Sequence, residues 1–164
     1  ERTKEIINSY EQFFYDELIA IFRRKLGLTV EEADDLKLTE DFLSWMQKNK
    51  KDYTITFRDF TKNPDSLFDD AEGKTWYEQY QRRLSLEQTS PEKRKQMMGQ
   101  VNPKFILRNY LAQEAIQDAE KSDFKKLINL LEVLKNPYAE NSEFDDFAKA
   151  PPEWGKKLEI SCSS

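Results

Sequence analysis

Apolar residues in the first part of this chain recur at steps of three and four positions, which places them on one face of an α-helix. That face is formed by Ile6, Ile7, Tyr10, Phe13, Phe14, Leu18, Ile21 and Phe22. Three basic residues at positions 23–25 suit the C-terminal end of a helix dipole, and Gly27 can stop the helix. The pattern predicts a helix of roughly 25 residues, about 40 Å long at about 1.5 Å per residue.

Three shorter helices are predicted next, each from a residue that can cap a helix N-terminus. Thr29 is placed to cap a short acidic helix over residues 30–36, and Thr39 to open a separate helix. Asp52 begins a third amphipathic helix, which the Asn-Pro-Asp sequence at residues 63–65 ends because proline restricts the residue before it.

The apolar spacing and the capping residues in the middle of the chain predict two more helices. One covers residues 73–87, with Trp76 and Tyr80 on its apolar side. The other begins at Ser90-Pro91, a capping residue followed by a proline suited to the first helical turn.

Two regular apolar stripes then predict a helical hairpin. The first helix would begin at Asn102-Pro103 and the second near residue 124, and the second would end at residues 136–137, Asn-Pro. From Tyr138 onward the sequence is irregular, with two consecutive prolines at residues 151–152. The tail is therefore not predicted to form a long helix.

The expected fold is all-α: a multi-helix bundle that ends in a helical hairpin and an irregular C-terminal tail. We treat residues 1–164 as one helical region, with possible sub-lobes 1–100 and 101–150 and a tail at 151–164. A chain of this size can bury roughly 70% of its unfolded surface, so a core without disulfides or metal is feasible.

Composition narrows the possible partners. The net charge is -5 and charges of both signs alternate along the chain, whereas nucleic-acid binders carry basic stripes. We therefore expect no nucleic-acid partner. No apolar run approaches the roughly 20 residues of a membrane span, so no membrane partner is expected either.

Composition also excludes several kinds of catalytic and binding site. The sequence contains no histidine, which excludes Ser-His and Cys-His nucleophile pairs and histidine-ligated metals. Its four glycines are far apart, at positions 27, 73, 99 and 155, whereas a phosphate-cradling loop needs them close together. We expect no catalytic, cofactor-binding or metal-binding residue in this chain.

Several groups of charged residues could bind a metal ion, a phosphate or an acidic partner. The acidic clusters at residues 34–35, 69–72 and 145–146 lack the alternating oxygen ligands and glycine of a calcium loop, so helix-start and loop carboxylates are the favoured interpretation. The basic groups at residues 82–83 and 93–95, and Lys104 with Arg108, would bind a phosphate or an acidic partner only if they converge in space. Separate solvated faces are the favoured interpretation.

Three tryptophans were considered as ligand-binding residues. Trp45 and Trp76 stand at helical spacing, so we expect them in the core. Trp154 lies in the proline-rich tail, and we expect it to pin that tail to a helical surface.

Two stretches near the end of the chain resemble the selenoprotein O family. Residues 102–116, Asn-Pro-Lys-Phe-Ile-Leu-Arg-Asn-Tyr-Leu-Ala-Gln-Glu-Ala-Ile, are similar to the family's Asn-Pro-Lys and Leu-Arg-Asn-Tyr signature. Residues 151–164, Pro-Pro-Glu-Trp-Gly-Lys-Lys-Leu-Glu-Ile-Ser-Cys-Ser-Ser, resemble the family's C-terminus just as closely. The resemblance covers most of the chain.

The resemblance implies that this chain is the C-terminal helical part of a larger, kinase-like protein adenylyltransferase. Family members bind ATP with a divalent metal, Mg²⁺ or Mn²⁺, and transfer AMP to Ser, Thr or Tyr hydroxyls of protein substrates. The implied partners are the upstream kinase-like domain of the same chain and those protein substrates. The catalytic residues lie upstream, so none is assigned here. The implied location is the bacterial cytoplasm.

Cys162 is the one position to which the resemblance assigns a role. In many eukaryotic members a selenocysteine stands there, and the family's terminal cysteine is implicated in redox control through a bond to the core. Because Cys162 is the only cysteine in this sequence, its partner would lie elsewhere. From spacing alone, a cysteine in such a tail can be oxidised or can have no role.

Two functions from different classes are compatible with the sequence. One is the structural or redox-regulatory part of an adenylyltransferase, inactive alone; the start at Glu1, with helical pattern from the first few residues, fits a fragment of a longer polypeptide. The alternative is a self-contained helical protein-interaction module. The first predicts a sizeable exposed apolar patch. The second predicts that all large apolar side chains are buried, except those that line one partner-binding groove.

Overall fold

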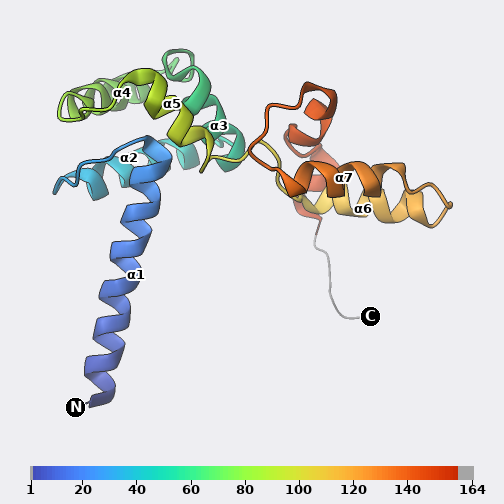
Figure 1. The fold of residues 1–164 in the computed structure, drawn as a ribbon, viewed down its shortest axis with the longest axis horizontal. Helices are drawn as coiled ribbons and strands as arrows, with labels where there is room; N and C mark the ends of the chain where they lie inside the picture. Colours follow the sequence, from blue (N-terminus) through green and yellow to red (C-terminus); the bar gives the residue numbers. More distant parts are fainter. Residues whose placement is uncertain (1, 159–164) are drawn as a thin grey trace. The chain divides into compact units, whose positions relative to one another are not determined.

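The computed structural model describes the backbone of residues 2–158 and the side chains of residues 9–158. All regular structure in this part of the chain is helical, which confirms the predicted all-α fold. The chain divides into two compact units, residues 1–102 and residues 103–164. Each unit has its own apolar core. Figure 1 traces the helices of both units along the chain.

The first helix, α1 (Arg2–Leu26), has the length that the apolar pattern predicts. Figure 1 shows most of it extending away from the other helices of the first unit. Only its C-terminal turns pack into the core, where Leu26 is fully buried and Phe22 is partly buried. Gly27 ends the helix with a φ of +72°, and a Cβ at this position would lie 2.4 Å from the Arg94 Cγ atom. Glycine is therefore required at this turn.

The helix predicted over residues 30–36 and the separate helix predicted from Thr39 are both wrong. A single helix, α2 (Asp35–Lys48), replaces them. Thr29 does not cap a helix, because its backbone N–H and its hydroxyl both donate to the carboxylate of Glu87. Thr39 lies buried inside α2, where its hydroxyl donates to the Asp35 carbonyl oxygen at 2.8 Å.

Two helices begin at the caps that the sequence predicts. Asp52 and Ser90 each accept a hydrogen bond from the backbone N–H three residues further on, at 3.0 and 3.3 Å. They start α3 (Tyr53–Lys62) and α5 (Pro91–Gly99). A short 3-10 turn, η1 (Pro64–Ser66), follows α3 at the predicted break.

Helix α4 (Ala71–Leu84) begins two residues earlier than the predicted start at residue 73 and ends before residue 87. Its cap is Asp70, whose carboxylate accepts hydrogen bonds from the Gly73 amide at 2.9 Å and from the Trp45 indole N–H at 2.8 Å. The same side chain therefore caps α4 and satisfies a donor of the core.

The core of the first unit is mostly aromatic. Phe42 is fully buried at its centre and stacks on Trp76, with ring centroids 4.4 Å apart. The rings of Phe57 and Phe60 each lie 5.3 Å from the Phe42 ring, and Trp45 also stacks on Phe42, with ring centroids 5.9 Å apart. Trp45 and Trp76 are thus core residues, as predicted from their helical spacing.

Asn102 does not begin a helix, so the predicted start at Asn102-Pro103 is wrong. Its fully buried side chain instead donates to the Lys25 carbonyl oxygen at 2.8 Å and to the Thr61 hydroxyl at 3.0 Å. Its own carbonyl oxygen accepts from the Arg58 guanidinium at 2.7 Å. Because these contacts hold Asn102 against the first unit, α6 begins only at Asn109 and ends at Ala119.

The second unit is built on the predicted hairpin of α6 and α7 (Lys125–Lys135). The turn between them contains Ser122 with a φ of +65°. Ahead of the hairpin, Phe105 is buried, and the N–H groups of Lys104 and Phe105 both donate to the Pro137 carbonyl oxygen, at 2.8 and 3.0 Å. This pairing joins the two ends of the hairpin.

The tail folds back on the hairpin through two short 3-10 segments: η2 (Ser142–Ala148) contacts α7, and η3 (Glu153–Lys157) contacts α6. The Trp154 ring meets the Tyr110 ring edge-on, with centroids 6.1 Å apart, so Trp154 pins the tail as expected. Gly155 is buried in the same place, and a Cβ there would lie 2.7 Å from the Tyr110 Cβ atom.

Candidate functional site

A buried ion-pair network holds α1, α2 and α4 together. Asp35 at the start of α2 is fully buried, and its two carboxylate oxygens each accept a hydrogen bond of 2.7 Å, one from Arg23 and one from Arg83. The Glu32 amide adds a third at 3.0 Å. Burial by itself raises the pKa of Asp35, but the bonds from Arg83, Glu32 and Arg23 outweigh it and lower the pKa below its usual value.

The network continues to Glu87. Arg83 donates to this carboxylate at 2.9 Å, and the N–H groups of Thr29 and Val30 also donate to it. Burial raises the pKa of Glu87, yet the hydrogen bonds from Thr29, Val30 and Arg83 hold it below its usual value. All the carboxylate oxygens therefore have partners, and the network acts as a fastener between helices rather than as an acid-base pair.

The candidate basic groups have separate roles. Arg83 belongs to the buried network, and Arg94 donates to the Thr89 carbonyl oxygen at 3.0 Å. Lys95 donates to the Lys62 carbonyl oxygen at 2.9 Å, and Lys104, in the second unit, pairs with Asp145. Each of these four cations is thus engaged locally.

The candidate acidic clusters are also divided among structural tasks. Asp35 lies in the buried network, Asp70 caps α4, Glu72 pairs with Lys48, and Asp146 pairs with Lys149. Within the described residues, no three histidine, cysteine or acidic side chains are grouped so as to hold a metal ion. The clusters thus follow the structural interpretation.

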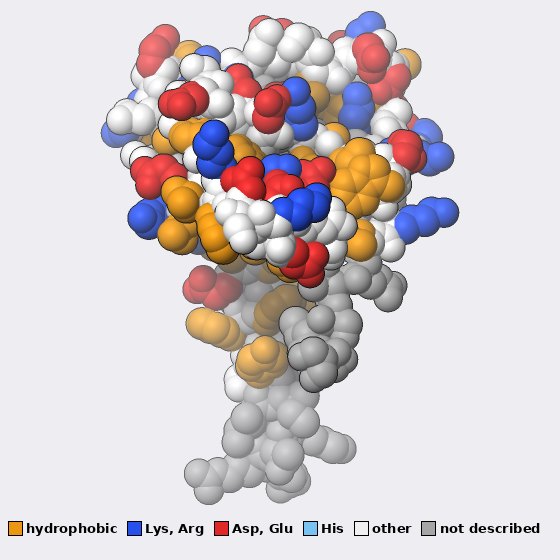
Figure 2. Space-filling view, turned by 90° about the vertical axis from the view of Figure 1, so that its right-hand side faces the viewer, with side chains coloured by type: hydrophobic (Ala, Val, Ile, Leu, Met, Phe, Trp, Pro, Cys, Tyr) orange, Lys and Arg blue, Asp and Glu red, His pale blue; other side chains and the backbone are white. Residues whose placement is uncertain are grey.

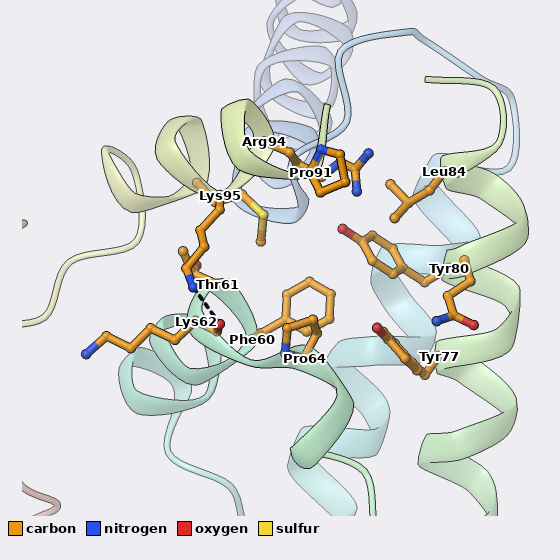
Figure 3. A pocket seen from close by; sticks show the side chains of 12 residues that line it. Phe60, Thr61, Lys62, Pro64, Tyr77, Tyr80, Leu84, Pro91, Arg94 and Lys95 are labelled. Carbon is orange, nitrogen blue, oxygen red and sulfur yellow. Dashed lines mark hydrogen bonds between the residues drawn. The ribbon is translucent and has the colours of Figure 1, made fainter. Parts of the chain in front are cut away.

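A recess of about 320 Å³ lies between α3, α4 and α5. Figure 3 shows its wall, where the rings of Phe60, Tyr77 and Tyr80 face the space below Arg94 and beside Lys95. Pockets for small molecules usually begin near 300 Å³ and combine apolar walls with a few converging polar groups. The volume and the walls of this recess meet that description.

The two phenol hydroxyls of the recess already have partners in the protein. The Tyr80 hydroxyl donates to the Leu26 carbonyl oxygen at 2.7 Å, and the Tyr77 hydroxyl donates to Asp65 at 2.6 Å. Burial and the contact with Asp65 raise the pKa of Tyr77 to about 12. Neither phenol is therefore poised to act as a base near neutral pH, and the recess offers aromatic walls rather than catalytic groups.

The most unusual surface of the first unit is the exposed half of α1. All side chains from residue 9 to residue 17 are exposed. Three aromatic residues share one face there, which we call the α1 aromatic patch: Tyr10, Phe13 and Phe14, with exposed fractions of 67%, 64% and 50%. Figure 2 shows hydrophobic side chains on the surface of this part of the helix, next to the grey residues. Contiguous apolar surface of this kind marks an interaction site.

The second unit has its own apolar surface, which we call the hairpin groove. Four leucines of α7 form one side of it: Leu127, Leu130, Leu131 and Leu134. The other side is α6, mainly through Ala112, Ala115 and Ala119. The groove has a volume of about 270 Å³, and no charged side chain lines it.

Cys162, the predicted redox residue, lies outside the described residues. None of the described helices is both long and apolar enough to cross a bilayer.

The sequence analysis missed the partners in the ion-pair network. Arg23 was assigned only to the helix dipole, but it bonds to Asp35, twelve residues away, and Arg83 lies 48 residues from Asp35. No spacing of residues within a single helix predicts ion pairs between residues so far apart in the sequence. The sequence analysis expects a sizeable exposed apolar patch where a larger protein docks, but it does not place that patch on α1.

Comparison with known proteins supports the resemblance. The family model described as "Protein adenylyltransferase SelO" matches residues 1–135. Two curated relatives called "Protein nucleotidyltransferase YdiU", from Vibrio cholerae and Pseudomonas fluorescens, are each 42% identical and align over 96% and 98% of this chain. A third, from Vibrio parahaemolyticus, is 39% identical over the whole chain.

The relatives are much longer than the region they share with this chain. The alignments cover 35% of the Vibrio cholerae and Pseudomonas fluorescens proteins and 36% of the Vibrio parahaemolyticus protein. The chain thus spans about a third of the length of the relatives it matches. From the match to the family model and from these relatives, the chain belongs to the SelO protein adenylyltransferase family.

Proposed function

We propose that this chain is the C-terminal helical part of a protein adenylyltransferase that transfers AMP from ATP to Ser, Thr or Tyr hydroxyls of other proteins. The chain contributes no catalytic group. Its task is to pack against the remaining, kinase-like two-thirds of the enzyme and to support it. We place this work in the cytoplasm, where ATP is available, and the organisms of the three relatives support a bacterial source.

The α1 aromatic patch is the observation that carries this proposal. Tyr10, Phe13 and Phe14 lie on a helix segment whose described side chains touch almost nothing within the first unit. Isolated helices shorter than about 12–15 residues are marginal in water, and most helical stability comes from packing an apolar face. A self-contained interaction module would instead bury such side chains everywhere except in the groove that binds its partner. The patch therefore supports docking against a larger body.

The residues that the structure describes do not fit ATP or its divalent metal. Adenylyl transfer, like phosphoryl transfer, needs metal ligands and phosphate-binding donors. The described residues hold no cluster of three metal-ligating side chains, and the four basic residues traced above are bonded to carbonyl oxygens or carboxylates. We assign ATP and Mg²⁺ or Mn²⁺ to residues outside this chain, and we derive no reaction step here.

Calorimetry tests the assignment of nucleotide binding. The 164-residue chain should show no heat of binding with ATP and Mg²⁺ at micromolar concentrations, whereas the full-length protein should bind. Micromolar, magnesium-dependent binding of ATP to this chain alone would place nucleotide chemistry in it and would contradict the proposal.

A substitution in the patch tests the docking role. In the full-length protein, Phe13→Asp should lower AMP transfer at least tenfold and lower the melting temperature, because a carboxylate would be forced into an apolar interface. The matched control is Glu11→Gln, an exposed position of the same helix outside the patch, which should leave both unchanged. Full AMP-transfer activity of the Phe13→Asp variant would contradict the proposed docking role of the patch.

We further propose that Cys162 serves redox control by forming a disulfide with a cysteine of the kinase-like part, two thiols losing two protons and two electrons to a cellular oxidant. Cys162 is the only cysteine of this chain, so its partner must belong to another part of the protein or to another molecule. Peptide mapping of the oxidised full-length protein without reductant should recover a peptide that links Cys162 to an upstream cysteine. Recovery of Cys162 only as the free thiol would remove this role.

A further inference from the structure

The recess between α3, α4 and α5 carries positive charge in a chain whose net charge is -5. Three basic residues, Lys62, Arg94 and Lys95, line it, and no acidic side chain does so among the described residues. Figure 3 shows the Lys62 side chain pointing away from the space, so Arg94 and Lys95 supply its charge. The sign of this charge favours a negatively charged ligand.

Arg94 is held in place but lacks a counter-charge. Its Cγ and Cδ atoms pack against Gly27, where an added Cβ would lie 2.4 and 2.9 Å from them. Its Nη2 atom donates to the Thr89 carbonyl oxygen at 3.0 Å. Its Nε atom is buried without a hydrogen-bond partner, and no carboxylate of the described part of the chain pairs with the guanidinium. A buried polar atom without a partner is costly, and a negative charge beside this guanidinium would offset part of that cost.

The walls of the recess suit a single aromatic ring. Phe60 and Tyr80 are 1% and 3% exposed, and their rings meet edge-on with centroids 5.0 Å apart, so they form a fixed floor. Tyr77 lies beside Tyr80, at a centroid distance of 6.1 Å, and Pro64 and Pro91 add apolar surface at the sides. The volume of about 320 Å³ is near the lower limit for ligand pockets, so a molecule with one ring fits better than a larger one.

We propose that this recess binds a small aromatic carboxylate. Figure 3 shows Arg94 and Lys95 on the α5 side of the space, with Pro64 and Tyr77 across from them. The carboxylate faces Arg94, whose planar guanidinium matches its geometry, and Lys95 adds a second positive charge. The ring lies against Tyr77 and Pro64. The site belongs to the first unit and is independent of the docking role proposed for α1.

NMR titration of the 164-residue chain, labelled with 15N, tests the site with benzoate as the probe. The amide signals of Tyr77, Arg94 and Lys95 should shift along a saturating curve. We expect a dissociation constant of roughly 1 mM, because a ligand with one ring has few atoms for contact. The absence of a saturating shift at these residues up to about 20 mM benzoate overturns the proposal.

Two matched probes separate the contribution of the ring from that of the charge. Benzamide has the same ring without the charge, and inorganic phosphate has the charge without the ring. Each should bind at least about tenfold more weakly than benzoate. Benzamide that binds as tightly as benzoate would remove the role of the basic residues, and phosphate that binds as tightly would remove the role of the aromatic walls. Either result contradicts the proposed ligand class.

Substitutions of the basic residues locate the bound carboxylate. Arg94→Met keeps the part of the side chain that packs against Gly27 and removes the charge, so benzoate should bind at least about tenfold more weakly. Lys95→Met, at an exposed position, should weaken binding about threefold, and it tests the site even if Arg94→Met lowers stability. The control is Arg82→Met, an exposed arginine of α4 that does not line the recess, which should leave the dissociation constant unchanged. Unchanged benzoate binding in both Arg94→Met and Lys95→Met overturns the proposal.

Discussion

The first unit holds two sets of aromatic residues that share regular helical spacing but differ in burial. Phe42, Trp45 and Phe57 lie on helices at apolar positions and have exposed fractions of 0%, 1% and 1%. Tyr10 and Phe13 lie on a helix at equally regular apolar positions and have exposed fractions of 67% and 64%. The first set has facing helices within the described part of the chain, and the second has none there. Helical periodicity thus identifies a face that must be covered but not the element that covers it.

The most direct test of this difference in burial is to replace one aromatic residue of each set by alanine. Phe42→Ala removes the ring that stacks on Trp76 and meets Phe57 and Phe60, so it should lower the free energy of unfolding by about 4 kcal/mol. Urea unfolding followed by circular dichroism measures this loss.

Phe13→Ala is the matched substitution in the other set. It should change the free energy of unfolding of the 164-residue chain by less than about 0.5 kcal/mol, because substitutions at exposed positions away from special features are nearly neutral. A loss of 2 kcal/mol or more in this chain, on the order of what a buried side chain contributes, would show that the patch is packed.

The next prediction concerns the polar fastener beside the aromatic core. Asp35→Asn should lower the free energy of unfolding by about 3 kcal/mol, because Arg23 and Arg83 lose the carboxylate that they share while remaining largely buried. The control is Asp41→Asn, which removes an exposed pair with Lys37 and should cost under about 1 kcal/mol. Equal effects of the two substitutions would mean that the network does not fasten the helices.

The same network predicts a pH dependence. The folded-state pKa values of Asp35 and Glu87 lie below their usual values, so both groups add stability at neutral pH. That stability is lost as the pH falls below about 4 and through the lowered folded-state pKa values. Urea midpoints measured from pH 7 to pH 3 should therefore fall more steeply for the wild-type chain than for Asp35→Asn. Parallel curves would contradict the assignment.

A smaller effect is expected where the tail meets α6. Gly155→Ala places a Cβ 2.7 Å from the Tyr110 Cβ atom, which cannot move aside easily, so η3 must shift and the Trp154 contact weakens. Amides of residues 153–157 should exchange hydrogen roughly tenfold faster, corresponding to about 1.4 kcal/mol. Gly99→Ala, where nothing lies within 4 Å of the added Cβ, should leave this exchange unchanged.

The elements that could be predicted from the sequence are those whose signals are local. α1 ends at Gly27, α3 starts after Asp52, and α5 starts after Ser90-Pro91, because each of these residues acts on its own turn of the chain. The predicted family was also correct, since the stretch at residues 102–116 lies in the region that the family model matches.

The errors arose where distant residues take over a local signal. Thr29 is an acceptable helix cap, but the carboxylate of Glu87, 58 residues away, binds it instead. Asn102 followed by proline is an acceptable helix start, but its side chain bonds to Lys25 and Thr61. The exposed apolar surfaces have a related limit, because the sequence shows an apolar face on α1 and on α7 without showing whether another part of the chain covers it.

The central claim is that the exposed half of α1 is made to pack against a body outside this chain. Hydrogen exchange of amides 9–17 in the 164-residue chain and in the full-length protein tests it most directly. The account predicts near-unprotected exchange in this chain and exchange at least 100-fold slower in the full-length protein. Equal rates in both would contradict it.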